Sequence, residues 1–224
     1  MRRGGQQRIP RPASFRPGGP PAWAALDPDK RRFTLAEIRD RLADLPPAVE
    51  RGPNVAGSQA AAVLMPLYEE DGDTRIVLIK RPETMSSHRG EIAFPGGKFE
   101  PGVDSDLRVT ALREAHEEVG LDPGAVEIVA RLDGIGTVAS RFTITPFVGF
   151  LAEPPVLTPS PGEVVRTLEV PLSDLLDPDA YREEHWGTDT ADFDVHFYDL
   201  EDETVWGATA RILTSFFSHL VEGR

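Results

Sequence analysis

Three closely spaced glutamates, Glu114, Glu117 and Glu118, are the residues whose types and spacing point most directly to chemistry. If this segment is a helix, the three side chains fall within about 100° of one another, and Leu112 and Ala115 point the other way, toward a core. Carboxylates so close together repel, and a divalent cation among them relieves the repulsion. An isolated pattern of this kind is more often a solvated acidic helix face, so its context decides the interpretation.

The context is a glycine turn upstream, where Pro95, Gly96 and Gly97 follow a predicted strand. Glycine permits unusual backbone angles and close approach to a ligand, and the Gly97 carbonyl could join the carboxylates around a metal. Lys98, the next residue, could contact a phosphate. The combination indicates a site for Mg²⁺ or Mn²⁺, which prefer oxygen ligands. Its predicted metal ligands are Gly97, Glu114, Glu117 and Glu118.

The segment from Gly97 to Leu121 resembles the Nudix box, G-x5-E-x7-R-E-U-x-E-E-x-G-U, where U is a bulky aliphatic residue. Its second half matches fully except for a small residue at the first U, through Arg113, Glu114, Ala115, Glu117, Glu118, Gly120 and Leu121. The first half is two residues longer than the family pattern, and its glutamate would fall on Val103 or Ser105. Glu100 or Asp104 is the local candidate to replace it. The resemblance covers most of residues 55–222 in pattern.

The lengthened box is similar to that of the coenzyme A pyrophosphatase subgroup, which carries an upstream signature L-L-T-x-R-S-x3-R-x3-G-x3-F-P-G-G. Arg81, Gly90 and the Phe94-Pro95-Gly96-Gly97 turn keep the spacing of that signature. Three positions differ, since Ile79, Pro82 and Ser86 replace the threonine, the serine and the second arginine. Arg89 or His88 would then supply the cation that Ser86 lacks. The predicted substrate-binding residues are Arg81, His88, Arg89 and Lys98.

The resemblance implies a metal-dependent diphosphatase that acts on coenzyme A or its derivatives and gives 3′,5′-ADP and 4′-phosphopantetheine. Metal ions held by the glutamates would neutralise the diphosphate and lower the pKa of a bound water. The general base is expected to be Glu117 or, from a distal loop, Glu163. Arg113 is expected to hold the glutamates by charge-assisted hydrogen bonds. The catalytic candidates are therefore Glu117, Glu163 and Arg113.

Three rival interpretations remain. A Nudix enzyme for ADP-ribose, a dinucleotide or a nucleoside triphosphate stays open because Ser86 departs from the subgroup. A nucleotide-sensing module without hydrolysis would not need the repulsive glutamate cluster, and the intact cluster argues against it. A scaffold with an acidic helix is disfavoured by the Pro-Gly-Gly turn.

The elements that must position these residues are short strands and helices without regular alternation. A capping box at Thr34 and Glu37 and an apolar stripe predict a helix over residues 34–45. A second helix is expected over 106–119, ending at Gly120, a short one over 172–176, and a closing amphipathic one over 208–221. Strands are predicted over 61–68, 76–80, 92–94, 126–132, 142–151, 195–200 and 204–206, with a hairpin turn at 71–73. The expected fold class is α+β, an α/β/α sandwich with a mixed sheet flanked by helices.

The first residues differ in composition from the rest of the chain. Proline, glycine and arginine dominate the segment, which predicts a mobile tail over residues 1–32 and one Nudix-like domain over 33–224. No apolar stretch typical of a secretory signal follows the early arginines.

The composition limits the partners. A net charge of −13 argues against nucleic acid and against an anionic membrane surface, although a local metal or a few cations can still attract a small anionic substrate. The chain contains no cysteine, which excludes disulfides and cysteine-type zinc sites and fits a cytoplasmic location. The expected partner is a small-molecule nucleotide substrate, and the sequence leaves a homodimer open.

Overall fold

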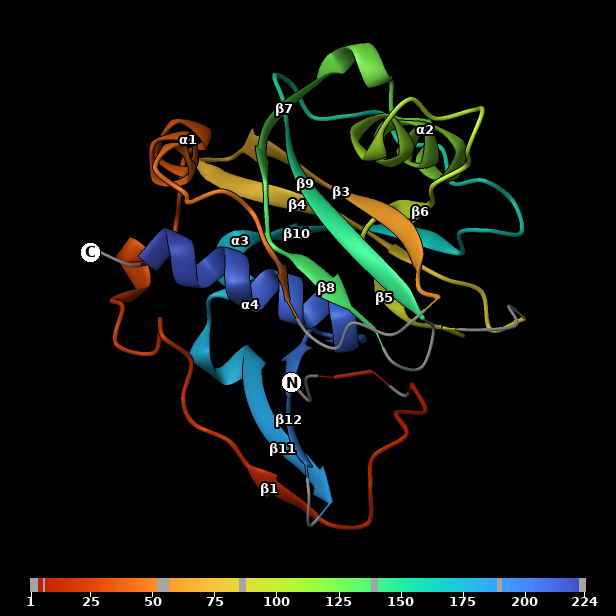
Figure 1. The fold of residues 1–224 in the computed structure, drawn as a ribbon. Coiled ribbons are helices and arrows are strands. Elements are labelled where there is room, and N and C mark those ends of the chain that lie inside the picture. The colour runs from red at the N-terminus through yellow and green to blue at the C-terminus, as the bar shows by residue number, and fades with distance from the viewer. Residues whose placement is uncertain are drawn as a thin grey trace.

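The structure, a computed structural model, describes residues 4–5, 7–51, 57–84, 88–137, 141–188 and 191–221. Its described strands form a large central sheet and a smaller second sheet (Figure 1). The central sheet runs in the order β10-β4-β3-β9-β8-β2, with β5, β6 and β7 pairing to β4, β3 and β9. These strands are β2 Glu50–Arg51, β3 Gln59–Glu70, β4 Asp73–Lys80, β5 Ile92–Ala93, β6 Gly96–Lys98, β7 Val126–Arg131, β8 Gly134–Gly136, β9 Phe142–Leu151 and β10 Arg166–Pro171.

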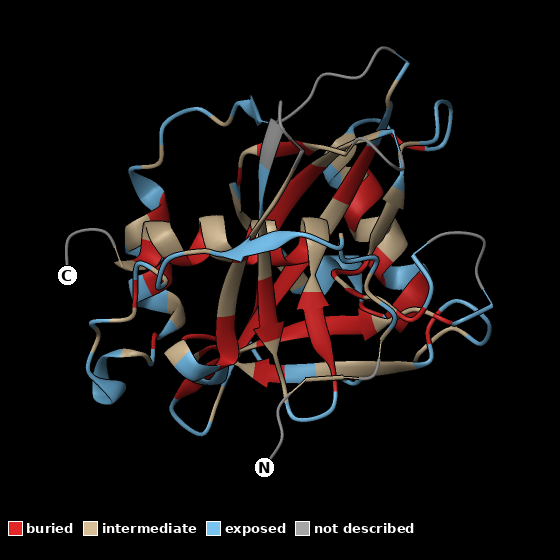
Figure 2. Ribbon diagram, turned by 90° about the horizontal axis from the view of Figure 1, so that it is seen from below, coloured by how far each residue is buried: buried red, intermediate tan, exposed pale blue. Residues whose placement is uncertain are grey.

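The sheet is mixed, because β3 runs parallel to β9 and antiparallel to β4 and β6. The predicted hairpin joins β3 to β4 at Asp71 and Gly72, whose φ angles of 54° and 75° are those of a turn that matches strand twist. Alternation along β3 sends Leu64 to one face of the sheet and Met65 to the other. Both faces of the sheet are therefore apolar and require cover (Figure 2).

Helix α2 (Leu107–Val119) covers one face. It begins at Asp106, whose side chain accepts a hydrogen bond from the Val109 amide at 2.9 Å, and it ends at Gly120 in the left-handed region. Its buried Ala111 and Ala115 lie in one apolar cluster with residues of β3 and β9. The small side chains let the helix approach the sheet closely, and this fixes the position of its glutamates.

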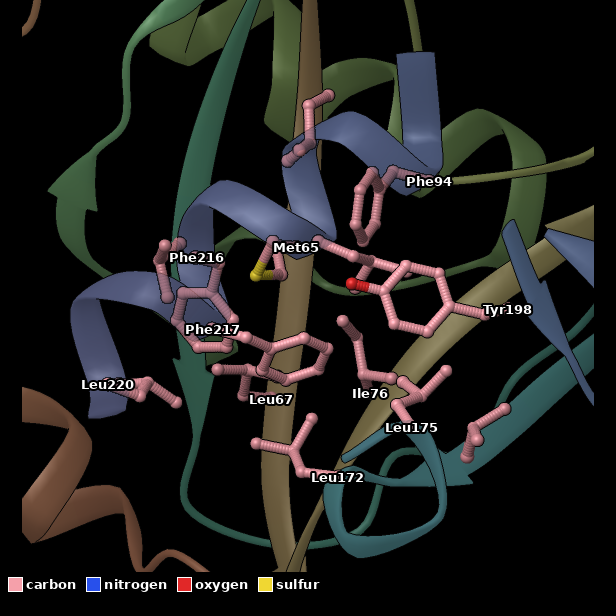
Figure 3. Packing of buried hydrophobic residues seen from close by; sticks show 14 of the residues in the cluster. Met65, Leu67, Ile76, Phe94, Leu172, Leu175, Tyr198, Phe216, Phe217 and Leu220 are labelled. Carbon is pink, nitrogen blue, oxygen red and sulfur yellow. The ribbon is translucent and has the colours of Figure 1, made fainter. Parts of the chain in front are cut away.

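The other face is covered by α1 (Leu35–Ala43), α3 (Leu172–Leu175) and α4 (Gly207–Val221). In α4, Phe216, Phe217 and Leu220 pack toward β3, where they share a cluster with Met65 and Leu67 (Figure 3). The Thr34–Glu37 capping box is present at the start of α1. Helices on both faces of a mixed sheet confirm the predicted α/β/α sandwich. Three single-turn 3₁₀ helices, η1 Pro28–Lys30, η2 Pro123–Ala125 and η3 Pro178–Ala180, connect the larger elements.

The second sheet has the order β1-β11-β12-β13. Its strands are β1 Phe15–Pro17, β11 Tyr181–Thr188, β12 Ala191–Asp199 and β13 Thr204–Trp206. The predicted pairing of the last two strands is present, with Tyr198 opposite Val205. Strand β11 was not predicted from the sequence, because its charged residues and histidine hide the alternation of apolar and polar residues that is typical of a strand.

The N-terminal segment differs from the expected mobile tail over residues 1–32. Phe15–Pro17 adds a strand to β11, and Trp23 is fully buried. The Trp23 ring lies 5.2 Å from the Tyr181 ring and 5.4 Å from the Phe217 ring, both edge to face. The composition of residues 1–32 led to the expectation of little burial. One tryptophan among many prolines makes most of the apolar contacts of this segment.

Replacing Trp23 with alanine should therefore destabilise the whole domain. Loss of a buried aromatic side chain costs about 3–5 kcal/mol, and urea unfolding followed by circular dichroism measures the change. The matched control is Phe193→Ala, since Phe193 is 56% exposed and its loss should change the stability by less than about 0.5 kcal/mol. Equal stability of Trp23→Ala and wild type would show that the segment does not pack on the domain.

Candidate functional site

The site is built where α2 lies against the glycine turn at β6. A side chain on Gly97 would bring its Cβ within 2.4–2.5 Å of the Glu114 carboxyl atoms, so the carboxylate occupies the space that only glycine leaves. A Cβ on Gly96 would lie 2.4 Å from the carbonyl oxygen of Ala62. Gly96 is thus required by the close approach of the β3 backbone, whereas a side chain at Gly97 would displace the Glu114 carboxylate from its present position.

Glu118 is the most deeply buried carboxylate of the cluster, with 7% of its side chain exposed. Its Oε2 accepts a hydrogen bond from the Gly96 amide at 2.9 Å, and Arg81 Nη1 lies 3.6 Å from its Oε1. The pKa of Glu118 is raised to about 7, mainly by burial and in smaller part by the nearby charges of Glu114 and Glu163, whereas the Gly96 hydrogen bond and Arg81 oppose the rise. The negative charge on Glu118 is therefore only partly compensated by the described residues.

Glu114 and Glu117 are held by Arg113. The Nη1 atom of Arg113 lies 3.0 Å from Glu114 and 2.9 Å from Glu117, and its Nη2 donates to the carbonyl oxygen of Lys98 at 3.2 Å. Burial raises the pKa of Glu114, and the charge of Glu117 adds to the rise, although Arg113 counteracts both. Glu117 is 53% exposed, so it forms the solvent side of the cluster. This geometry agrees with the expected role of Arg113 as a holder of glutamates.

Asp104 is one of the two local candidates to replace the first glutamate of the family pattern. Its carboxylate forms a two-point pair with Arg113, at 2.8 Å to Nε and 3.0 Å to Nη2. The same carboxylate accepts hydrogen bonds from the Glu100 amide at 2.9 Å and from the Thr110 hydroxyl at 3.0 Å. The Asp104 side chain is fully buried, and the hydrogen bonds from Arg113 lower its pKa to about 2. Of the two local candidates, Asp104 is thus the one that binds Arg113.

The loop after β9 brings Glu163 to the cluster. The Thr158 and Ser160 amides donate to the carbonyl oxygens of Val119 and Glu118 at 2.8 Å, which fixes this loop to the end of α2. The Glu163 amide then bonds back to Ser160 at 3.2 Å, and its side chain is near enough to raise the pKa of Glu118. The predicted distal glutamate is therefore exposed in a loop that is fixed to the end of α2, within electrostatic range of Glu118.

Two of the predicted substrate-binding cations, Arg81 and His88, lie near one another. Arg81 contacts Glu118, and His88 lies near Arg81, with its Nδ1 2.8 Å from Glu91. That contact with Glu91 raises the pKa of His88 above its ordinary value.

Arg89 is exposed in the same loop, whereas Ser86 lies outside the described residues. Lys98 is the predicted contact that the structure does not bring to the carboxylates. Successive strand residues face opposite sides, and its ammonium lies 5.5 Å from the centre of the Phe142 ring.

The donor set fits a hard divalent cation. The Glu114 carboxylate lies against Gly97, and the Glu118 carboxylate accepts a hydrogen bond from the Gly96 amide. The Glu117 carboxylate shares Arg113 with Glu114, and the charge of Glu163 reaches Glu118. Two arginines, Arg113 and Arg81, oppose them among the described residues. Oxygen donors of this kind, with an excess of negative charge and a partly solvated face, suit Mg²⁺ or Mn²⁺.

The fold and this arrangement agree with the family comparison. The family model described as "NUDIX domain" matches residues 58–189, which include β3 to β10, α2 and the Glu163 loop. The chain belongs to the NUDIX domain family. A solved MutT/nudix family protein from Enterococcus faecalis is similar in fold, with a TM-score of 0.50 and 15% identity over 85% of this chain and 70% of that chain.

Several curated proteins are similar in sequence. "Nudix hydrolase 22, chloroplastic" from Arabidopsis thaliana is 41% identical over 68% of this chain and 52% of its own length, and "Nudix hydrolase 15, mitochondrial" from the same plant is 36% identical over 74% and 60%. This chain thus spans about half to three fifths of those relatives. "Peroxisomal coenzyme A diphosphatase NUDT7" from Mus musculus is 37% identical over 79% of this chain and 70% of its own length.

The names of these relatives refer to chloroplasts, mitochondria and peroxisomes, so the cytoplasmic location stays a prediction. None of the helices in the described ranges combines the length and the apolar character that crossing a membrane requires.

Asp104 gives the site a pH-dependent contribution to stability. Its pKa falls from an ordinary 3.8 to about 2 in the folded protein, so the contribution is complete above about pH 4 and is lost as the pH falls through 2. Asp104→Asn should lower the free energy of unfolding at pH 7 by about 1–3 kcal/mol, because a buried charge-assisted pair is broken. Urea unfolding between pH 7 and pH 3 should show the difference shrinking with acid. The exposed Asp29→Asn is the control, and a difference independent of pH would contradict the assignment.

Proposed function

We propose that the protein is a metal-dependent hydrolase that cleaves the diphosphate linkage of coenzyme A or its derivatives into 3′,5′-ADP and 4′-phosphopantetheine. The observation that carries the proposal is the convergence of Glu114 and Glu118 on the Gly96-Gly97 backbone. Membership of the NUDIX family supports hydrolysis of a diphosphate, and the likeness to a relative named as a coenzyme A diphosphatase supports the substrate. The lengthened box and the Arg81–Gly90–Phe94 spacing agree with it.

The proposed metal ligands are the carbonyl of Gly97 and the carboxylates of Glu114, Glu117 and Glu118. Mg²⁺ or Mn²⁺, when bound, neutralises diphosphate oxygens and lowers the pKa of a water molecule. The hydrogen bond from the Gly96 amide to Oε2 holds the buried Glu118 side chain in one orientation. Arg113, itself fixed by Asp104, does the same for Glu114. The protein therefore supplies a rigid set of oxygen donors and needs little rearrangement at the moment of reaction.

Glu163 is the proposed general base, with Glu117 as the alternative. Glu117 already accepts a hydrogen bond from Arg113 at 2.9 Å, so that oxygen is engaged with the guanidinium. Glu163 is exposed, within electrostatic range of Glu118, and a water molecule can reach it. In the proposed reaction Glu163 takes a proton from the attacking water, the new bond forms to one phosphorus, and the bond from that phosphorus to the bridging oxygen breaks.

Arg81, His88 and Arg89 are the proposed contacts for the anionic substrate. Arg81 has one Nη atom near Glu118, and its side chain is 20% exposed at the edge of the site. His88, whose pKa is raised by the hydrogen bond with Glu91, keeps its proton to a higher pH than an ordinary histidine and can act beside Arg81. The 3′-phosphate distinguishes coenzyme A from ADP-ribose and from dinucleotides, and these cations are the proposed side chains that bind it.

A substrate panel with Mg²⁺ or Mn²⁺ tests the function. Coenzyme A, dephospho-coenzyme A, ADP-ribose, a dinucleotide and a nucleoside triphosphate are supplied separately, and products are identified by mass. The expected result is the highest kcat/KM for coenzyme A or a derivative. Faster turnover of ADP-ribose than of either coenzyme would contradict the substrate and leave the diphosphatase assignment intact.

The same assay tests the residues. Glu118→Gln keeps the side-chain volume and removes the charge, so kcat should fall by at least about a hundredfold while the circular dichroism spectrum is retained. Glu163→Gln should lower kcat by about 10²–10⁴-fold if it is the base. Glu153→Gln, an exposed change at the start of the same loop, is the matched control and should behave as wild type. Near-normal activity of Glu118→Gln at saturating metal would overturn the metal site.

A further inference from the structure

A second set of metal-ligating side chains lies on the β11–β12 hairpin, away from α2. Alternation places Glu183 and His185 on one face of β11, and the register sets Asp194 opposite His185 and His196 opposite Glu183. Glu183, His185 and Asp194 each offer a ligand atom, and these three atoms lie within 4.8 Å of one another. The set therefore combines an imidazole and two carboxylates at metal-site spacing.

The His185 ring has a carboxylate beside each of its nitrogens. Its Nδ1 lies 2.6 Å from Asp194, and its Nε2 lies 3.8 Å from Glu183 Oε1. A neutral imidazole has a single N–H to donate, which Asp194 takes at the shorter distance. In that tautomer the lone pair on Nε2 faces a carboxylate oxygen, and a cation between the two atoms, either a second proton or a metal ion, removes the repulsion.

The separation of these two atoms suits a metal ion. Two ligands of a tetrahedral zinc ion at bond lengths of about 2.0–2.1 Å are about 3.3 Å apart, so a shift of a few tenths of an ångström closes the site. A histidine that donates its second ring N–H to a carboxylate is also the usual arrangement at metal centres, because it fixes the ring and makes the ligand nitrogen more basic. Asp194 is in the position to do this, and it can ligate instead when its side chain turns.

Glu183 is held in place from its other side. Its Oε2 accepts a hydrogen bond from the Tyr181 hydroxyl at 3.1 Å and lies 3.4 Å from His196 Nδ1. A Cβ on Gly18 would lie 2.4 Å from Glu183 Oε1, so the N-terminal segment passes directly over this carboxylate. The site is thus preorganised, and it lies where the N-terminal segment meets the hairpin.

Two arginines compete with a cation here. Arg16 of β1 lies opposite His185 in the register, and Arg211 of α4 is near enough to His196 to lower its pKa, in addition to the larger effect of burial.

We propose that Glu183, His185 and Asp194 form a binding site on the β11–β12 hairpin for a divalent transition metal ion, with Zn²⁺ as the best-suited ion. Imidazole together with carboxylate favours Zn²⁺ over Mg²⁺. This site is separate from the glutamates of α2, which offer oxygen ligands only.

Calorimetric titration of the full chain with Zn²⁺ tests the site. The double variant Glu114→Gln, Glu118→Gln removes two of the three competing carboxylates of α2 and serves as the host. One equivalent of Zn²⁺ should bind to this host, and adding His185→Ala or Asp194→Asn should weaken that binding by at least about tenfold. His219→Ala removes an imidazole in the last turn of α4 and should leave the affinity unchanged.

A second measurement separates binding from folding. The melting temperature of the host without metal should be the same with and without His185→Ala, and Zn²⁺ should raise it only when His185 is present. The proposal is overturned if the host binds no Zn²⁺ or if His185→Ala binds it as tightly as the host does. Activity of the wild type with Mg²⁺ is independent of either outcome.

Discussion

The contact between the buried Glu118 carboxylate and the Gly96 amide is the interaction on which the rest of the site depends. A carboxylate loses favourable hydration when it is buried. The hydrogen bond from the Gly96 amide and the Arg81 guanidinium 3.6 Å away do not fully restore it. The raised pKa of Glu118 is the result. A structure that keeps such a group must either accept a proton on it or bring a cation to it, and the surrounding carboxylates favour the cation.

Every larger element of the fold helps to keep that contact. Small residues of α2, Ala111 and Ala115, let the helix lie close to β3, and Gly96 and Gly97 remove the side chains that would hold it off. Arg113 donates hydrogen bonds to Asp104 and to the Lys98 carbonyl oxygen, which fixes the helix to β6 and the loop after it. At the other end, Gly120 in the left-handed region lets the chain turn away, and the loop carrying Glu163 bonds to the last carbonyls of α2. The helix is thus fixed at both ends.

Much of this could be predicted from the sequence because local rules decide it. The capping box at Thr34, the left-handed stop at Gly120 and the hairpin turn at Asp71 and Gly72 depend on neighbours within a few residues, and all three are present. The glutamate spacing on α2 follows from helix geometry alone. The fold class also followed, because the order of strands and helices excludes regular βαβ alternation.

The remainder depends on contacts distant in sequence. Asp104 could be named as one of two candidates, but only its buried position beside Arg113 distinguishes it from Glu100. Lys98 adjoins Gly97 in the chain, yet strand alternation turns it to the other face, toward Phe142. Trp23 finds its partners Tyr181 and Phe217 far along the chain, which composition cannot reveal. The Glu183–His185–Asp194 group required the register of β11 with β12.

The most direct measurement of the central claim is the titration of the Glu118 carboxyl group by carbon-13 NMR, assigned by comparison with Glu118→Gln, with and without Mg²⁺. Without metal the carboxyl should titrate at about pH 7, because burial and neighbouring carboxylates disfavour its charge. With saturating Mg²⁺ the midpoint should fall below the ordinary glutamate value of 4.5, since the bound cation favours the charged form. A midpoint near 4.5 without metal, or one that Mg²⁺ does not move, would contradict the account.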